Sequence, residues 1–146
     1  MLSGDHIDLV VRAALDEDAP WGDPTSEALI PADAVATAEL RARESGVFSG
    51  GEVFTAAFAL TDSRIDIDVR VSDGEAFAAG DVLASVTGPA RGVLQAERVG
   101  LNFTQRMSGI ATLTAAYVAA VAGTGPIGSP IQARVLLPSG RVVSVL

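Results

Sequence analysis

One stretch of the chain gathers polar side chains that could contact a ligand. In residues 95 to 112, QAERVGLNFTQRMSGIAT, an otherwise apolar pattern is interrupted by Glu97, Arg98, Asn102, Gln105 and Arg106. Arg98 and Asn102 are four residues apart, as are Asn102 and Arg106, so a helix places them on one face. The alternative is that these groups hydrogen-bond between helices within the core, with Glu97 and Arg98 at the surface. The residues alone leave both interpretations open.

Other polar groups have a functional and an ordinary interpretation. Arg41 and Arg43 share the solvent face of a predicted strand, where they form an anion contact or only a charged sheet face. His6 lies in the first turn of a predicted helix, which favours a solvated or capping role over that of a ligand. An acidic group at a helix end and in the next loop suggests a metal or acid/base site, although such residues are usually solvated: Asp16, Glu17, Asp18 and Asp23.

The residue types that are missing exclude several kinds of chemistry. All ten basic residues are arginines, so no Schiff base, lysine-tethered cofactor or P-loop lysine exists. The chain has no cysteine, which excludes a disulfide, a thiolate zinc site and a cysteine nucleophile. With His6 as the single histidine, a metal site built on several imidazoles is also excluded.

Length and charge narrow the class of protein. The 146 residues are about one domain long, and 49% hydrophobic with 19% charged residues is an ordinary globular composition. A formal charge of -8 argues against binding to nucleic acid or an anionic membrane. We expect neither an export signal nor a transmembrane helix, because acidic residues interrupt the start and glycines and prolines interrupt the uncharged stretch 107–133. These features suit the cytoplasm.

The hydrophobic periodicity predicts alternating helices and strands. We expect a helix over residues 5 to 18 with Asp5 as its N-cap, then a loop over residues 20 to 31. Two consecutive helices should follow Pro89, separated at Ser108-Gly109. The elements between are a strand over 34–47, a helix over 52–60, a strand over 64–71 and a strand over 82–86.

The connections favour an α+β fold with an antiparallel sheet and flanking helices. The turn signals Asp73-Gly74 and Gly80-Asp81 leave too little chain for a crossover helix. After Gly123 the pattern changes to a proline- and glycine-rich loop, with a hairpin around residues 138–140 as a further possibility.

Three runs, in order and spacing, resemble the amino-terminal half of nicotinate-nucleotide pyrophosphorylases, or quinolinate phosphoribosyltransferases. They are LDEDAPWGDPTSEALIP, ARESGVFSGGEVF and DGEAFAAGDVLASVTGPARGVLQAERVGLNFTQRMSGIATLTAAYV, within roughly residues 9 to 125. The resemblance implies a cytoplasmic glycosyltransferase of NAD (pyridine nucleotide) biosynthesis. Such an enzyme transfers a phosphoribosyl group from phosphoribosyl pyrophosphate to quinolinate with Mg²⁺, giving nicotinate mononucleotide, CO₂ and pyrophosphate.

The resemblance also implies a homodimer in which the amino-terminal region of one subunit completes the site of its partner. The arginine of the family's ER-x-x-LN motif corresponds to Arg98, which would bind a quinolinate carboxylate in the partner's site. It assigns no catalytic residue and no metal ligand to this chain, because the Mg²⁺ ligands are expected in the barrel that follows in the family. A pyrophosphorylase-like family associated with molybdenum transport shares parts of this architecture.

The resemblance ends abruptly after Gly125, where the Asp-Thr-Arg-Lys-Thr and Gly-Gly-x-x-Asn-His-Arg segments of the family do not follow. We therefore expect an amino-terminal α/β sandwich domain over residues 1–108, a helix over 109–125 leading into a truncated α/β barrel, and a non-matching tail over 126–146, out of frame or unrelated in origin. Such a chain is expected to be inactive alone and to self-associate through exposed apolar helix faces.

Two other function classes compete with the enzyme. DGEAFAAGDVLASVTG resembles the paired turns of lipoyl or biotinyl carrier domains, but the absence of lysine excludes a carrier. A non-catalytic dimerisation or binding module that keeps the amino-terminal fold stays as the alternative.

Overall fold

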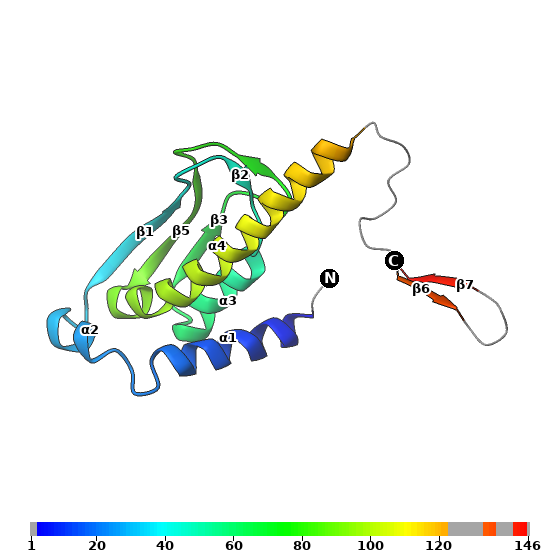
Figure 1. The fold of residues 1–146 in the computed structure, drawn as a ribbon. Helices are drawn as coiled ribbons and strands as arrows, with labels where there is room; N and C mark the ends of the chain where they lie inside the picture. The colour runs from blue at the N-terminus through cyan, green and yellow to red at the C-terminus, as the bar shows by residue number, and fades with distance from the viewer. Residues whose placement is uncertain (1–2, 123–132, 137–141, 146) are drawn as a thin grey trace. The chain divides into compact units, whose positions relative to one another are not determined.

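The computed structural model describes residues 3–122, 133–136 and 142–145, in two compact units, Met1–Leu113 and Thr114–Leu146. The first unit contains five strands and four helices, the last of which continues into the second unit (Figure 1). In chain order the elements are α1 (Gly4–Asp18), α2 (Pro24–Leu29), β1 (Val35–Arg41), β2 (Gly46–Val47), α3 (Gly51–Thr61), β3 (Asp66–Val69), β4 (Ala76–Phe77), β5 (Val82–Pro89), α4 (Ala90–Val121), β6 (Ala133–Leu136) and β7 (Val142–Val145).

The main sheet is antiparallel, with strand order β1-β5-β3. Alternate residues face the core because side chains point to opposite faces along a strand. Ala38, Val86 and Ile67 are paired across the strands and form an inward row. The next row, Glu39, Ser85 and Asp68, is polar, and its two carboxylates are exposed. The predicted α+β class and antiparallel sheet are confirmed.

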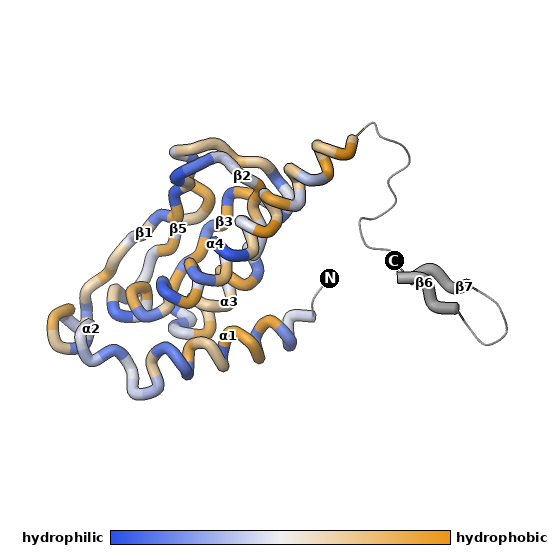
Figure 2. Tube along the Cα trace, viewed as in Figure 1, coloured by the Kyte–Doolittle hydropathy of each residue, from blue (hydrophilic) through white to orange (hydrophobic). Residues whose placement is uncertain are grey.

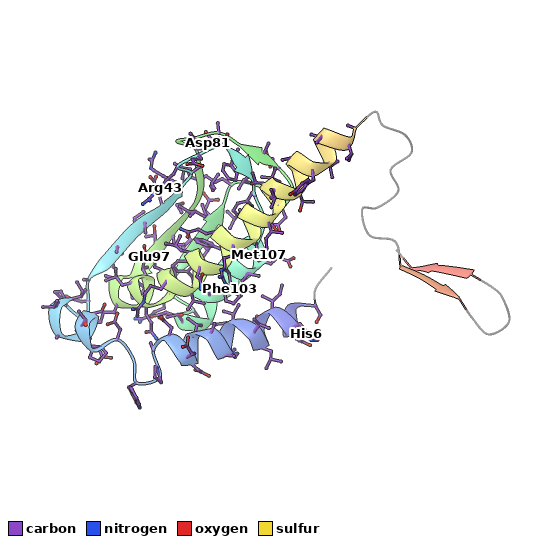
Figure 3. All side chains as sticks on the ribbon, viewed as in Figure 1. His6, Arg43, Asp81, Glu97, Phe103 and Met107 are labelled. Carbon is purple, nitrogen blue, oxygen red and sulfur yellow. The ribbon has the colours of Figure 1, made fainter. Side chains whose placement is uncertain are left out.

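Helices α1, α3 and α4 supply most of the core that covers the inward face of the sheet. The two largest side chains of α3, Phe54 and Phe58, are 3% and 2% exposed, and their ring centroids lie 4.8 Å apart. Burying such aromatic side chains is the dominant stabilising contribution in a small domain. Phe103 and Met107, labelled in Figure 3, extend this packing along α4. Figure 2 shows hydrophobic and hydrophilic residues alternating along α4, as expected for a helix with one buried face.

A second, two-stranded sheet pairs β2 with β4 and is held against the surrounding elements by polar contacts. Asp73 accepts hydrogen bonds from the N–H groups of Gly50 and Gly51 at the start of α3. Gly50 has φ +106°, a left-handed conformation that lets both N–H groups converge on one carboxylate. The sequence pattern extended the first strand to residue 47, but β1 ends at Arg41 and residues 46–47 belong to this other sheet.

The predicted break at Ser108-Gly109 is wrong, because α4 is one helix of 32 residues. A glycine inside a helix costs about 1 kcal/mol relative to alanine, which weakens a long helix without ending it. Ser108 also gains a partner, since its hydroxyl accepts from the N–H of Ser49 and donates to the Ser49 carbonyl. Thr112 accepts from the N–H of Val47 one turn later. These contacts fix α4 to β2 and to the residues that follow it.

Two predictions about the first 31 residues are also corrected. The N-cap of α1 is Ser3, and Asp5 lies in the first turn, where a carboxylate still interacts favourably with the helix dipole. The predicted loop over residues 20 to 31 contains the short helix α2. Asp23 before Pro24 is not helical, as expected, but a proline suits the first position of a helix and starts one here.

In the second unit, β6 and β7 form an antiparallel pair with Ala133 opposite Val145 and Leu136 opposite Val142. This pair agrees with the possible hairpin in the tail, whose proposed turn at residues 138–140 lies outside the described residues. None of the helices described is long and apolar enough to cross a membrane.

Candidate functional site

The exposed face of α4 carries the polar residues that the sequence singles out. The opposite face is buried through Ala90, Val93, Ala96, Val99, Gly100 and Thr104. All five polar residues of the candidate stretch are exposed: Glu97, Arg98, Asn102, Gln105 and Arg106. The interpretation that places Asn102, Gln105 and Arg106 within the core is therefore wrong, whereas its placement of Glu97 and Arg98 at the surface is confirmed.

Arg98 differs from the other polar residues of this face because a carboxylate from another element meets it. The Nη2 atom of Arg98 lies 3.2 Å from Oδ2 of Asp18, the last residue of α1. The Arg98 side chain is 62% exposed, whereas that of Asp18 is 25% exposed. The guanidinium is therefore tethered at one edge and open to solvent over most of its surface.

A second arginine of α4 holds the connection between α1 and β1 in place. Arg91 donates from Nε to the carbonyl of Ile30 at 2.9 Å, and from Nη2 to the same carbonyl at 2.7 Å and to that of Glu27 at 2.9 Å. These carbonyls lie in and just after α2, where helix carbonyls lack partners within the helix. Arg91 and Arg98 are seven residues apart, two helical turns, so both face this connection.

The connection itself is ordered by Asp23, the N-cap of α2. Its carboxylate accepts from the Ser26 hydroxyl at 2.7 Å and from the Ser26 N–H at 3.1 Å. These two hydrogen bonds lower the pKa of Asp23 below its ordinary value of 3.8, and the positive charge of Arg98 makes a smaller contribution in the same direction. Trp21, in the turn before this cap, is 90% exposed. Arg98 thus lies near enough to this cap for its charge to act on Asp23.

The other sequence candidates are less organised for chemistry. Arg41 pairs with Glu39 on its own strand, and Arg43 is exposed beyond the strand end, which agrees with a charged sheet face. His6 is exposed and lies near Ser3, with Nδ1 and Oγ 3.5 Å apart. Asp16 and Glu17 are exposed, as the solvated interpretation requires, but Asp18 is not simply solvated because it pairs with Arg98. Among the residues that the structure describes, no three carboxylate or imidazole groups could hold a metal ion.

The comparison with family models decides the family. Residues 23–108 match the model described as quinolinate phosphoribosyl transferase, N-terminal domain. The chain belongs to this family. The matched range includes the α2 cap, both sheets of the first unit, and Arg91 and Arg98 of α4.

Curated proteins and solved structures of this phosphoribosyltransferase family are similar to the chain over much of its length. The nicotinate-nucleotide pyrophosphorylase [carboxylating] of Mycobacterium leprae is 42% identical over 120 residues, which are 78% of this chain and 41% of the relative. The structure of NadC from Streptococcus pyogenes matches with a TM-score of 0.79 and 37% identity, covering 83% of this chain and 43% of that one. A nicotinate-nucleotide pyrophosphorylase from Francisella tularensis matches with a TM-score of 0.79 and 30% identity. The chain therefore spans about two fifths of the length of these relatives.

Sequence reasoning missed two contributors to this site of the quinolinate phosphoribosyltransferase domain. The pairing of Asp18 with Arg98 joins residues 80 positions apart, and no periodicity predicts which carboxylate at the end of one helix meets an arginine of another. Arg91 was available from helical spacing, because it lies two turns before Arg98 on a predicted helix. Its hydrogen-bond partners are backbone carbonyls, and because every residue has one, the sequence does not indicate which of them Arg91 contacts.

Proposed function

We propose that this chain is the amino-terminal part of an enzyme that makes nicotinate mononucleotide from quinolinate and phosphoribosyl pyrophosphate. In this reaction the pyridine nitrogen forms a bond to the ribose carbon, pyrophosphate leaves, and one ring carboxylate is released as CO₂ while the ring carbon takes a proton. The family match over residues 23–108 and the 42% identity to a carboxylating pyrophosphorylase support the proposal.

Within this enzyme, Arg98 is a substrate contact that binds a quinolinate carboxylate. A guanidinium suits this role because it stays charged at any working pH and its planar fork can bind a carboxylate through two parallel hydrogen bonds. The supporting observation is that Arg98 is 62% exposed and meets one carboxylate at one edge, whereas Arg91 already makes three hydrogen bonds to backbone carbonyls.

The proposal places the remaining parts of the site outside this chain. Among the residues described, no cluster of three or more carboxylate or imidazole groups could hold a metal ion, and we propose that Mg²⁺ is held by the part of the enzyme that follows this domain in the relatives. Arg98 would then act in a homodimer, reaching the site of the partner subunit. None of the roles that we propose for residues of this chain involves the metal. We place the enzyme in the cytoplasm.

The test compares this chain alone with an extended enzyme, defined as this chain joined to the remaining residues of the Mycobacterium leprae relative. Each is assayed for nicotinate mononucleotide formation that depends on both quinolinate and phosphoribosyl pyrophosphate. We expect product from the extended enzyme and none from the chain alone. Product from the chain alone would contradict the assignment of the metal to the part of the enzyme that follows this domain in the relatives. An inactive extended enzyme that still dimerises would favour a non-catalytic dimerisation module.

A further inference from the structure

The carboxylate of Asp18 occupies a position that local forces within α1 do not favour. The last turn of α1 holds Asp16, Glu17 and Asp18 and no basic residue, although the carbonyl end of a helix dipole is negative and destabilises nearby carboxylates. Oδ2 of Asp18 is buried and accepts no hydrogen bond from the described residues. The positive charge beside the Asp18 carboxylate is therefore supplied by another helix, through Arg98 of α4.

A gain in stability does not explain the pair. One partner is 62% exposed, and ion pairs of this kind contribute about 0 to 1 kcal/mol because solvent screens them. The structure contains a contrasting case in Arg91, which makes three hydrogen bonds to two carbonyls and ties α2 to α4. Asp18 adds no comparable link between elements, but it does restrict where the Arg98 guanidinium can lie.

We propose that Asp18 is a positioning residue for Arg98. Its carboxylate holds one edge of the guanidinium by an ion pair with Nη2, and the N–H groups of the fork stay available to an incoming carboxylate. A guanidinium has five N–H donors, and because the contact with Asp18 is an ion pair and not a hydrogen bond, two parallel donors can still bind the ligand. This inference rests on the proposed function only for the identity of the ligand that Arg98 binds. The positioning of Arg98 by Asp18 is a property of the chain without ligand.

The positioning is tested on the 146-residue chain by NMR of arginine side chains, with ¹H–¹⁵N heteronuclear NOEs measured at each Nε. We expect the Nε of Arg98 to be more mobile than that of Arg91, which three hydrogen bonds hold, and more rigid than that of Arg106. In Asp18→Asn it should become as mobile as that of Arg106, an exposed arginine of α4 with no ion pair among the residues described. An unchanged Arg91 signal in this variant shows that the fold and the connection are intact.

Asp62→Asn is the control, because Asp62 also forms an ion pair with an exposed arginine, Arg64, at 2.7 Å, although here the two residues are close in sequence and hydrogen-bonded. It should mobilise Arg64 and leave Arg98 unchanged. A wild-type Arg98 as mobile as Arg106, or an Arg98 that Asp18→Asn does not affect, would overturn the proposal without requiring any substrate.

A kinetic measurement on the extended enzyme separates positioning from a structural role. Asp18→Asn should raise the KM for quinolinate about two- to fivefold, the range set by an exposed ion pair, and leave kcat unchanged. An unchanged or lowered KM would overturn the proposal, since a carboxylate that merely competes with the substrate would lower KM when removed. If Arg98→Ala also leaves the KM unchanged, the proposed function of Arg98 fails. If only Asp18→Asn has no effect, the positioning role fails alone.

Discussion

Arg91 and Arg98 are the same residue type on the same side of one helix, yet the groups around them give the two guanidinium ions different roles. Arg91 donates three hydrogen bonds to the carbonyls of Glu27 and Ile30, so it stabilises the connection between α1 and β1. Arg98 meets a single carboxylate and faces solvent. The role of an arginine is thus set by how many of its donors the fold has already used.

The stabilities of two alanine variants should separate these roles. Arg91→Ala leaves carbonyls at the end of α2 without protein donors, and hydrogen bonds from a charged donor contribute about 1.5 to 3 kcal/mol each. We expect the free energy of unfolding to fall by about 2 kcal/mol in Arg91→Ala and by less than about 1 kcal/mol in Arg98→Ala. Urea unfolding followed by circular dichroism measures both. Equal losses would mean that Arg98 is structural as well.

The pH dependence of the connection should follow the Asp23 carboxyl. The Ser26 hydroxyl and N–H lower its folded-state pKa below 3.8, so the charged carboxylate stabilises the folded state above about pH 4. This contribution is lost as the pH falls through the lowered pKa. In Ser26→Ala the hydroxyl is absent, and we expect the pKa of Asp23 to rise toward its ordinary value, as measured by ¹³C NMR of the carboxyl carbon. The same titration midpoint in both proteins would contradict this account of the cap.

Among the elements, α4 shows most directly how packing overrides local sequence. Gly109 lies in the interior of the helix and is exposed, and a Cβ there would meet no atom within 4 Å. Ser108 and Thr112 on either side of it hydrogen-bond to the backbone of Ser49 and Val47. These tertiary contacts keep α4 continuous where a sequence pattern suggests a break.

Gly109→Ala should therefore stabilise the protein by about 1 kcal/mol, the difference in helix propensity between the two residues. Gly88→Ala is the contrasting variant, because its Cβ would lie 2.8 Å from the Cα of Ile65 on the neighbouring backbone. We expect the second change to destabilise by about 1 to 3 kcal/mol. Thermal unfolding of both variants measures the difference. A destabilised Gly109→Ala would indicate that α4 bends or opens at this position.

The elements that sequence predicts well are those whose periodicity reflects a single buried face. Ile65, Ile67 and Val69 alternate with exposed residues as their pattern requires, and the burial of Val53, Phe54, Ala57 and Phe58 follows the helical spacing. The short elements escape prediction because tertiary contacts define them. β2 and β4 have two residues each, and α2 depends on its Asp23 cap and on Arg91.

At the scale of the whole molecule, the site and the fold differ in how far sequence predicts them. Arg98 and its exposed helix face follow from helical spacing together with the family resemblance. The position of Asp18 beside Arg98 depends on where the end of α1 packs, which no local pattern encodes. The expected domain limits at residues 108 and 125 stay a prediction.

The apolar side chains exposed along the later turns of α4 lead to a prediction about association. Ile110 and Leu113 are 68% and 57% exposed, and Tyr117, Val118 and Val121 are also exposed. We expect this chain to self-associate as its concentration rises, because burying each such side chain contributes about 1.5 kcal/mol or more. The double variant Ile110→Glu/Leu113→Glu should weaken association at least about tenfold by sedimentation equilibrium. Leu29→Glu, at a 74% exposed leucine of α2, is the control and should have no effect. A chain that stays monomeric at millimolar concentration would contradict the prediction.

The most direct test of the central claim is the KM for quinolinate of the extended enzyme carrying Arg98→Ala. Losing the charged partner of a bound carboxylate costs about 2 kcal/mol or more, so the KM should rise at least about thirtyfold. Arg64→Ala removes another exposed arginine that also pairs with an aspartate, and its KM should stay within about twofold of the wild-type value. If Arg98→Ala changes the KM no more than Arg64→Ala does, the assignment of Arg98 as a substrate contact is contradicted.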